Sequence, residues 1–229
     1  MTLEFVIREN TTDQKVIQEV IKRNVYERKK MNFFIKDSPV WLDLGGNIGT
    51  FTCLAASKGC TVITFEPEPD NFRLLNENIK TNNLSATIYQ EGVVAGDSGS
   101  LDLYICKGDY NKYRHTIHKV RGRQTITIQV RNFKSILEEY KPTGVKIDIE
   151  GAEIEILESM KEWPNHVSHI VFEYSFDVDK SIPRFKKIID SLSQQFEVFY
   201  NKFDETKEKW EFYPFAIIVY CKRLQTIIN

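Results

Sequence analysis

The sequence has almost no net charge, few cysteines and no long apolar run, and each absence excludes a class of protein. Lysines and arginines number 31 against 32 aspartates and glutamates, which disfavours broad binding to nucleic acid or to an anionic membrane. No apolar run approaches the roughly 20 residues that span a bilayer. Four cysteines are scattered without metal-site spacing, which predicts reduced thiols, and charges interrupt the N-terminus too early for a signal peptide. We therefore expect a cytoplasmic protein.

The length and composition favour a single domain. The chain has 229 residues, of which 41% are hydrophobic, enough for a sizeable core. We interpret 1–229 as one domain, with residues 1–36 as an N-terminal appendage. Within the appendage, alternation over 3–8 predicts a short strand, and apolar spacing over 13–23 predicts a helix.

From Val40 onward, strand patterns alternate with helix patterns. Such alternation predicts a parallel sheet with right-handed crossovers. The final two strands are close enough in sequence to pair antiparallel. Between the third strand and the next helix, residues 95–130 contain two alternating runs that predict an antiparallel β-ribbon with a polar loop. The expected strands lie at 40–44, 61–67, 86–94, 144–149, 166–175, 196–200 and 215–223, and the core helices at 50–59, 69–82, 132–140 and 181–195.

The stretch VWLDLGGNIGTFT, residues 40–52, places a glycine-rich turn directly after the first core strand. Such a turn lets backbone approach a ligand closely, and the next helix offers unpaired N–H groups. The dinucleotide fingerprint G-x-G-x-x-G fails, because Asn47 and Thr50 stand where it needs glycines, and a P-loop fails for lack of G-K-[ST]. The turn alone indicates a nucleotide-like ligand other than NAD or ATP.

Two acids support this interpretation. A carboxylate inside an apolar strand is costly unless something pairs with it, so we expect Asp43 to face the ligand crevice and meet a cationic group. Glu66 ends the second strand, 23 residues later, where an acid typically binds the two hydroxyls of a ribose.

The stretch VKIDIEGAEIEIL, residues 145–157, forms the other half of the predicted site. Lys146 and Asp148 fall on one face of the strand, and Glu150 and Gly151 open the following helix. These ionisable groups lie at the carboxyl end of a central strand, where open α/β sheets bind ligands.

Three stretches in this order, WLDLGGNIGTFT, FEPEPDNFRLLNENI and VKIDIEGAEIEILES, closely resemble the FkbM-type S-adenosylmethionine-dependent methyltransferases. The resemblance covers roughly residues 3–175. It implies a class I methyltransferase fold: a doubly wound, Rossmann-like α/β sheet of seven mainly parallel strands with an antiparallel last strand. It also implies S-adenosylmethionine as cofactor, held by these residues: Asp43, Gly45, Gly46, Asn47, Gly49, Glu66, Glu91, Gly92 and Asp148. Members of this family are mainly O-methyltransferases acting on sugar or natural-product hydroxyls.

Methyl transfer to a hydroxyl needs alignment and a proton acceptor. Asp148 and Glu150 are the predicted base candidates, beside Lys146, with His115 and His118 as alternates. A metal that lowers the pKa of the hydroxyl is the other route. Asp148 and Glu173 end adjacent strands and could hold Mg²⁺ with waters. The chain lacks the Asp-Asn pair that catechol-type methyltransferases carry after the fifth strand, which argues against the metal.

The polar loop 107–123 is the predicted acceptor surface. It carries six lysines and arginines and one aspartate, and sugars stack on tyrosines and bond to such side chains. The predicted substrate-binding residues are Tyr110, Tyr113, Arg114, His118 and Glu173.

Three functions remain open from the sequence. The first is an O-methyltransferase for a small molecule or glycan, such as a deoxysugar. The second is an RNA methyltransferase using the basic loop, and the third is a non-catalytic cofactor-binding module. The near-neutral charge favours the first, with no nucleic-acid or membrane partner expected.

Overall fold

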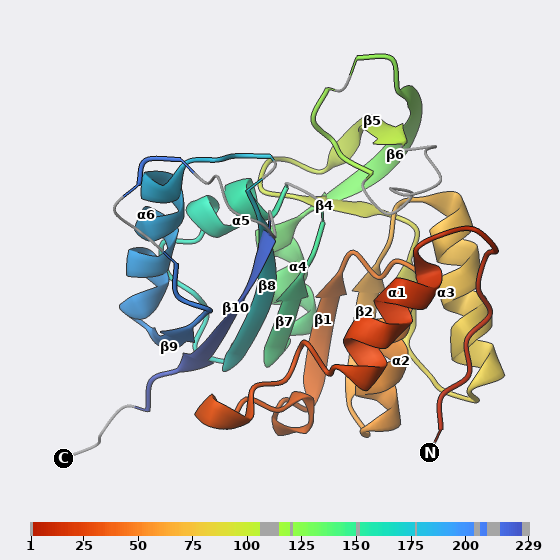
Figure 1. The fold of residues 1–229 in the computed structure, drawn as a ribbon, viewed down its shortest axis with the longest axis horizontal. Coiled ribbons are helices and arrows are strands. Elements are labelled where there is room, and N and C mark those ends of the chain that lie inside the picture. Colours follow the sequence, from red (N-terminus) through yellow and green to blue (C-terminus); the bar gives the residue numbers. More distant parts are fainter. Residues whose placement is uncertain are drawn as a thin grey trace.

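The computed structural model describes residues 2–105, 115–119, 121–149, 152–176, 178–203, 207–209 and 216–225. The main sheet has seven strands in the order β3-β2-β1-β7-β8-β10-β9 (Figure 1). Strand β10 alone runs against the others, since it pairs antiparallel with both β8 and β9. The predicted doubly wound α/β sheet with an antiparallel last strand is confirmed. Its strands are β1 Val40–Leu44, β2 Thr61–Phe65, β3 Thr87–Tyr89, β7 Gly144–Ile147, β8 His169–Ser175, β9 Phe196–Phe199 and β10 Ala216–Arg223.

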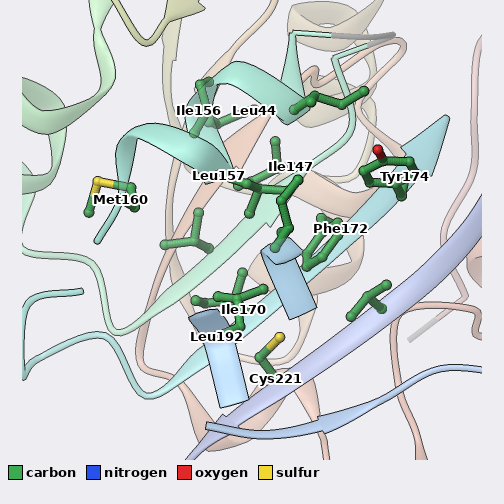
Figure 2. Close-up of a cluster of buried hydrophobic side chains, with 14 of the residues drawn as sticks. Leu44, Ile147, Ile156, Leu157, Met160, Ile170, Phe172, Tyr174, Leu192 and Cys221 are labelled. Carbon is green, nitrogen blue, oxygen red and sulfur yellow. The ribbon is translucent and has the colours of Figure 1, made fainter. Parts of the chain in front are cut away.

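Helices cover both faces of this sheet (Figure 1). On one face a cluster joins strands β7 and β8 to residues of α5 and α6 (Figure 2). The Ser181 hydroxyl caps α6 by accepting a hydrogen bond from the Arg184 N–H, which satisfies a donor that the first turn leaves free. The helices of the sheet are α2 Thr50–Ser57, α3 Pro69–Thr81, α4 Phe133–Tyr140, α5 Glu153–Ser159 and α6 Ile182–Ser193.

A second, three-stranded sheet stands beyond the carboxyl ends of the central strands (Figure 1). It contains β4 Gly92–Val94, β5 Gly99–Ile105 and β6 Gln124–Asn132. The antiparallel pair of β5 and β6 is the predicted ribbon. The run expected as one third strand is divided: β3 stays in the main sheet, while β4 pairs in parallel with β6. The ribbon is thereby joined to the edge where the site lies.

The N-terminal segment differs from its prediction. Residues 3–8 form no strand; two asparagines hold this stretch instead, Asn78 in α3 and Asn82 directly after it. The Asn82 side chain accepts from the Glu4 N–H at 2.9 Å, and the Asn78 side chain accepts from the Val6 N–H at 2.6 Å. The strand predicted from alternation is therefore absent, and side-chain amides take the place of a neighbouring strand. The expected helix begins as α1 Asp13–Ile17 and continues as a π-helix, η1 Gln18–Lys22, before the short 3₁₀ turns η2 Lys29–Met31 and η3 Ile35–Asp37.

Candidate active site

A cavity of about 370 Å³ opens at the carboxyl ends of β1, β2, β7 and β8. Its floor is the turn after β1, and one wall comes from the small sheet. The opposite wall comes from the N-terminal segment, with seven residues between Lys15 and Tyr26. The turn after β1, the small sheet, the N-terminal segment and the ends of β7 and β8 therefore meet around one space. This is the position where open α/β sheets bind ligands.

The turn after β1 is shaped by close packing. Gly45 has a φ of 81°, and a Cβ there would lie 1.8 Å from the backbone oxygen of Asp148. Gly49 has a φ of 87°, and its Cβ would lie 2.7 Å from a methyl carbon of Leu75. The glycines are thus required by the chain itself, in addition to any ligand. Gly45 and Gly46 line the cavity; Gly49, expected as a ligand contact, does not.

Asn47 and Glu66 hold each other in place at this turn. Asn47 adopts a left-handed φ of 50° and its N–H donates to Glu66 Oε2 at 2.7 Å. The other carboxylate oxygen accepts from the Glu68 N–H at 3.0 Å. Burial raises the pKa of Glu66 to about 7, although these hydrogen bonds favour its ionised form. Both residues line the cavity as predicted.

Asp43 is placed differently from its prediction. Its side chain is fully buried and does not line the cavity. Asp43 Oδ1 lies 3.0 Å from Lys146 Nζ, and Oδ2 accepts from the Thr52 hydroxyl at 2.7 Å. The cation that compensates this carboxylate is a lysine of the same chain. The sequence could not show this, because the register that sets Asp43 beside Lys146 exists only in the sheet.

Lys146 connects the turn to the acids of β7. Its ammonium donates to the carbonyl oxygen of Gly45 at 2.7 Å and lies 3.8 Å from Asp148 Oδ2. Burial works to lower the pKa of Lys146, but the charges of Asp43 and Asp148 outweigh it and the pKa is raised. Lys146 therefore stays protonated and holds the floor of the cavity in place.

Tyr26 is a residue of the site that sequence reasoning missed. Its side chain is buried, lines the cavity, and donates from its hydroxyl to Asp148 Oδ2 at 2.9 Å. The two residues are 122 positions apart. No motif surrounds Tyr26, and the only signal was its place in an amphipathic N-terminal segment.

Glu173 stands on β8 beside the end of β7 and also lines the cavity. Burial and the neighbouring charges of Asp148, Glu153 and Glu19 raise its pKa to about 8, against a smaller opposing effect of Lys146. At neutral pH Glu173 is thus mainly a neutral acid. Glu173 thus brings a protonated carboxyl into the cavity that the carboxyl of Asp148 also lines, a combination that suits acid–base chemistry.

Comparison with known proteins shows to which family the chain belongs. A model of the FkbM methyltransferase domain matches residues 43–199, more than half of the chain. The chain belongs to the FkbM methyltransferase family. This is a family of S-adenosylmethionine-dependent methyltransferases, and the sheet order is that of the class I, Rossmann-like fold that the resemblance implied.

Two relatives show how far the likeness extends. The chain is 31% identical over 147 residues to a hexuronic acid methyltransferase, AglP, of Haloferax volcanii, a match that covers 63% of this chain and 59% of that protein. It is 23% identical over 183 residues to the methyltransferase sdnD of Sordaria araneosa, with 65% of this chain and 69% of that protein covered. The match therefore spans less than two thirds of the archaeal relative.

The residues that line the cavity near β2 fit S-adenosylmethionine, the cofactor that the family implies. Gly45, Gly46 and Asn47 form a surface without bulky side chains, and Glu66 presents a carboxylate with unused acceptor positions. Glu91 and Gly92, predicted for the adenine end, line the cavity too. Glu91 Oε2 lies 3.9 Å from Arg131 Nε.

Of the two histidines singled out from the sequence, only His115 lines the cavity. Burial together with Arg8 and Arg123 lowers the pKa of His115 to about 4, so it is neutral at pH 7. His118 does not line the cavity. Four further predicted residues, Tyr110, Tyr113, Arg114 and Glu150, lie outside the described residues.

Among the described residues, no cluster of side chains supports metal binding. No group of three or more histidine, cysteine, aspartate or glutamate side chains there could hold a metal ion. Asp148, one of the two suggested ligands, already accepts a hydrogen bond from Tyr26.

In the part of the chain that the structure describes, no helix has the length and apolar character to cross a membrane.

Proposed function

We propose that this protein transfers a methyl group from S-adenosylmethionine to a hydroxyl of a sugar, a glycan or a natural product. One observation carries the proposal: a single cavity is lined by Glu66 and the glycine turn and also by Asp148 and Glu173. Glu66 and the turn suit the cofactor, and the two other acids suit a hydroxyl that must lose a proton. Lys146 holds the turn in place beside Asp148.

The residues of the β2 end would hold the cofactor. Glu66 would accept hydrogen bonds from the ribose hydroxyls, and the stretch from Glu91 to Val93 would hold the adenine. Gly45, Gly46 and Asn47 would hold the amino-acid end. When bound, S-adenosylmethionine supplies a methyl group on a sulfonium, and the electron pair of the broken carbon–sulfur bond stays with sulfur.

Asp148 is the proposed general base. Its side chain is 28% exposed while its charged neighbour Lys146 is only 4% exposed, so Asp148 is the group that an acceptor can reach. Asp148 takes the hydroxyl proton as the acceptor oxygen bonds to the methyl carbon, and later releases it to water. Glu173, protonated at neutral pH, donates to a second oxygen of the acceptor.

The relatives support an oxygen-rich acceptor, since the archaeal one is described as acting on a hexuronic acid. That substrate is a property of the relative. For this chain a sugar hydroxyl, for example of a deoxysugar, is proposed because Asp148 can accept from one hydroxyl while the protonated Glu173 donates to the next oxygen.

Calorimetric titration with S-adenosylhomocysteine tests the cofactor half of the proposal. We expect binding by the wild-type protein and a loss of at least about tenfold in Glu66→Ala, which removes the acceptor for the ribose. Absence of heat with the wild-type protein would reject the proposed cofactor site.

Acceptor screening tests the other half. Sugars and polyketide alcohols are incubated with S-adenosylmethionine, with and without EDTA, and release of S-adenosylhomocysteine is measured. We expect turnover that survives EDTA and falls about 100-fold or more in Asp148→Asn, while this variant keeps its cofactor affinity. Loss of turnover in EDTA would show that a metal, and not Asp148, activates the hydroxyl.

A further inference from the structure

Tyr26 reaches the site from outside the matched methyltransferase domain, which begins at residue 43. The residue follows the π-helix η1, and η1 packs against α2. Its ring meets the ring of Phe51 edge-on, with centroids 5.3 Å apart and planes at 85°. A buried ring held by another ring has one orientation, so the direction of its hydroxyl is set by packing.

The hydroxyl of Tyr26 and the ammonium of Lys146 converge on the same atom. Asp148 Oδ2 accepts from Tyr26 at 2.9 Å and lies 3.8 Å from Lys146 Nζ. One oxygen of the carboxylate is therefore held by two side chains of the protein.

We propose that Tyr26 is a positioning residue for methyl transfer: by holding Oδ2, it fixes the orientation in which the carboxylate of Asp148 meets the hydroxyl of the acceptor. This inference rests on the proposed function, in which Asp148 is the base. The step itself is the one described above, in which the acceptor proton moves to Asp148 as the oxygen–carbon bond forms. Tyr26 exchanges no atom in that step.

Tyr26 is suited to orient a base and unsuited to be one. Burial, and then the charges of Asp148 and Glu173, raise its pKa well above 10. The hydroxyl therefore stays protonated and donates at every pH where the enzyme would work. A fixed donor on one oxygen of a carboxylate restricts its rotation, and catalysis depends steeply on such placement.

The decisive experiment is a double-mutant cycle with Tyr26→Phe and Asp148→Asn. The substrates are S-adenosylmethionine and a hydroxyl acceptor from the screen. Tyr26→Phe keeps the ring against Phe51 and removes only the hydroxyl, and we expect kcat to fall about 10- to 100-fold. Its affinity for S-adenosylhomocysteine should stay within about threefold of wild type. If Tyr26 acts through Asp148, adding Tyr26→Phe to Asp148→Asn should lower kcat no further.

Tyr140→Phe is the matched control. It removes a tyrosine hydroxyl that is bonded to Tyr89 at 2.6 Å and does not line the cavity, so kcat should be unchanged. Full activity of Tyr26→Phe, or independent losses that multiply in the double variant, would overturn the role of Tyr26 and leave the proposed function standing. A wild-type protein that binds S-adenosylhomocysteine but methylates no hydroxyl would overturn both.

Discussion

At the scale of single residues, the centre of the site is a buried ion pair, that of Asp43 with Lys146. Both side chains are almost completely buried and lie 3.0 Å apart. Removing one partner of such a pair is costly because the other is left charged in an apolar surrounding, whereas replacing both is often neutral. The pair also binds the turn, because Lys146 donates to the carbonyl oxygens of Leu44 and Gly45.

We therefore expect Lys146→Met to lower the free energy of unfolding by about 3–5 kcal/mol. The double variant Asp43→Asn with Lys146→Met should recover most of that loss, because no buried charge remains. Urea unfolding of the wild type, both single variants and the double variant measures this. If the two losses simply add, the ion pair is not what stabilises this part of the core.

At the scale of elements, the turn between β1 and α2 is determined by the strand next to it. Gly45 passes so close to the backbone of Asp148 that no side chain fits between them. The carboxyl ends of β1 and β7 are thereby locked together, and with them the cofactor turn and the proposed base. The same element contains Asn47 in a left-handed conformation that asparagine tolerates better than most residues.

Gly45→Ala and Gly59→Ala separate the two reasons for a glycine. Both positions have a positive φ, 81° and 87°, but a Cβ at Gly59 would meet nothing within 4 Å. Gly59→Ala should cost only the left-handed strain, about 1–2 kcal/mol. Gly45→Ala should cost several kcal/mol more and abolish binding of S-adenosylhomocysteine, as measured by urea unfolding and calorimetry. Equal losses in the two variants would show that contact with Asp148 is unimportant.

At the scale of the whole molecule, the site makes stability depend on pH. The folded protein keeps a proton on Glu173 up to a pKa of about 8, whereas an unfolded glutamate releases it near pH 4.5. Between these values the folded state binds more protons than the unfolded state, so the free energy of unfolding falls as pH rises. Glu66, with a pKa of about 7, acts in the same direction. Below about pH 6.5 the buried histidines His115 and His169, whose pKa values are lowered to about 4, act in the opposite direction. We therefore expect the stability to decline between about pH 6.5 and 8.

Glu173→Gln should remove one part of this decline, because glutamine imitates the protonated acid at every pH. Its stability relative to wild type should rise between pH 4.5 and 8 by up to about 1.4 kcal/mol per pH unit, and then stay constant. Thermal and urea unfolding across pH 5–9 measures the difference. Glu155→Gln, on the exposed side of α5, removes the same charge elsewhere and should not change the slope. A constant difference between Glu173→Gln and wild type would contradict the raised pKa.

Much of this protein was determined by the sequence alone, because the relevant signals are local. Alternation of strand and helix patterns predicted the sheet, and the glycine turn with Glu66 led to the cofactor end that we propose. The neighbours of Asp43 and Asp148 were decided only by the tertiary structure. Strand register placed Lys146 beside Asp43, and the N-terminal segment brought Tyr26 to Asp148 across 122 positions. Periodicity reports which face of an element is buried, but the partner of a buried charge depends on how distant elements pack.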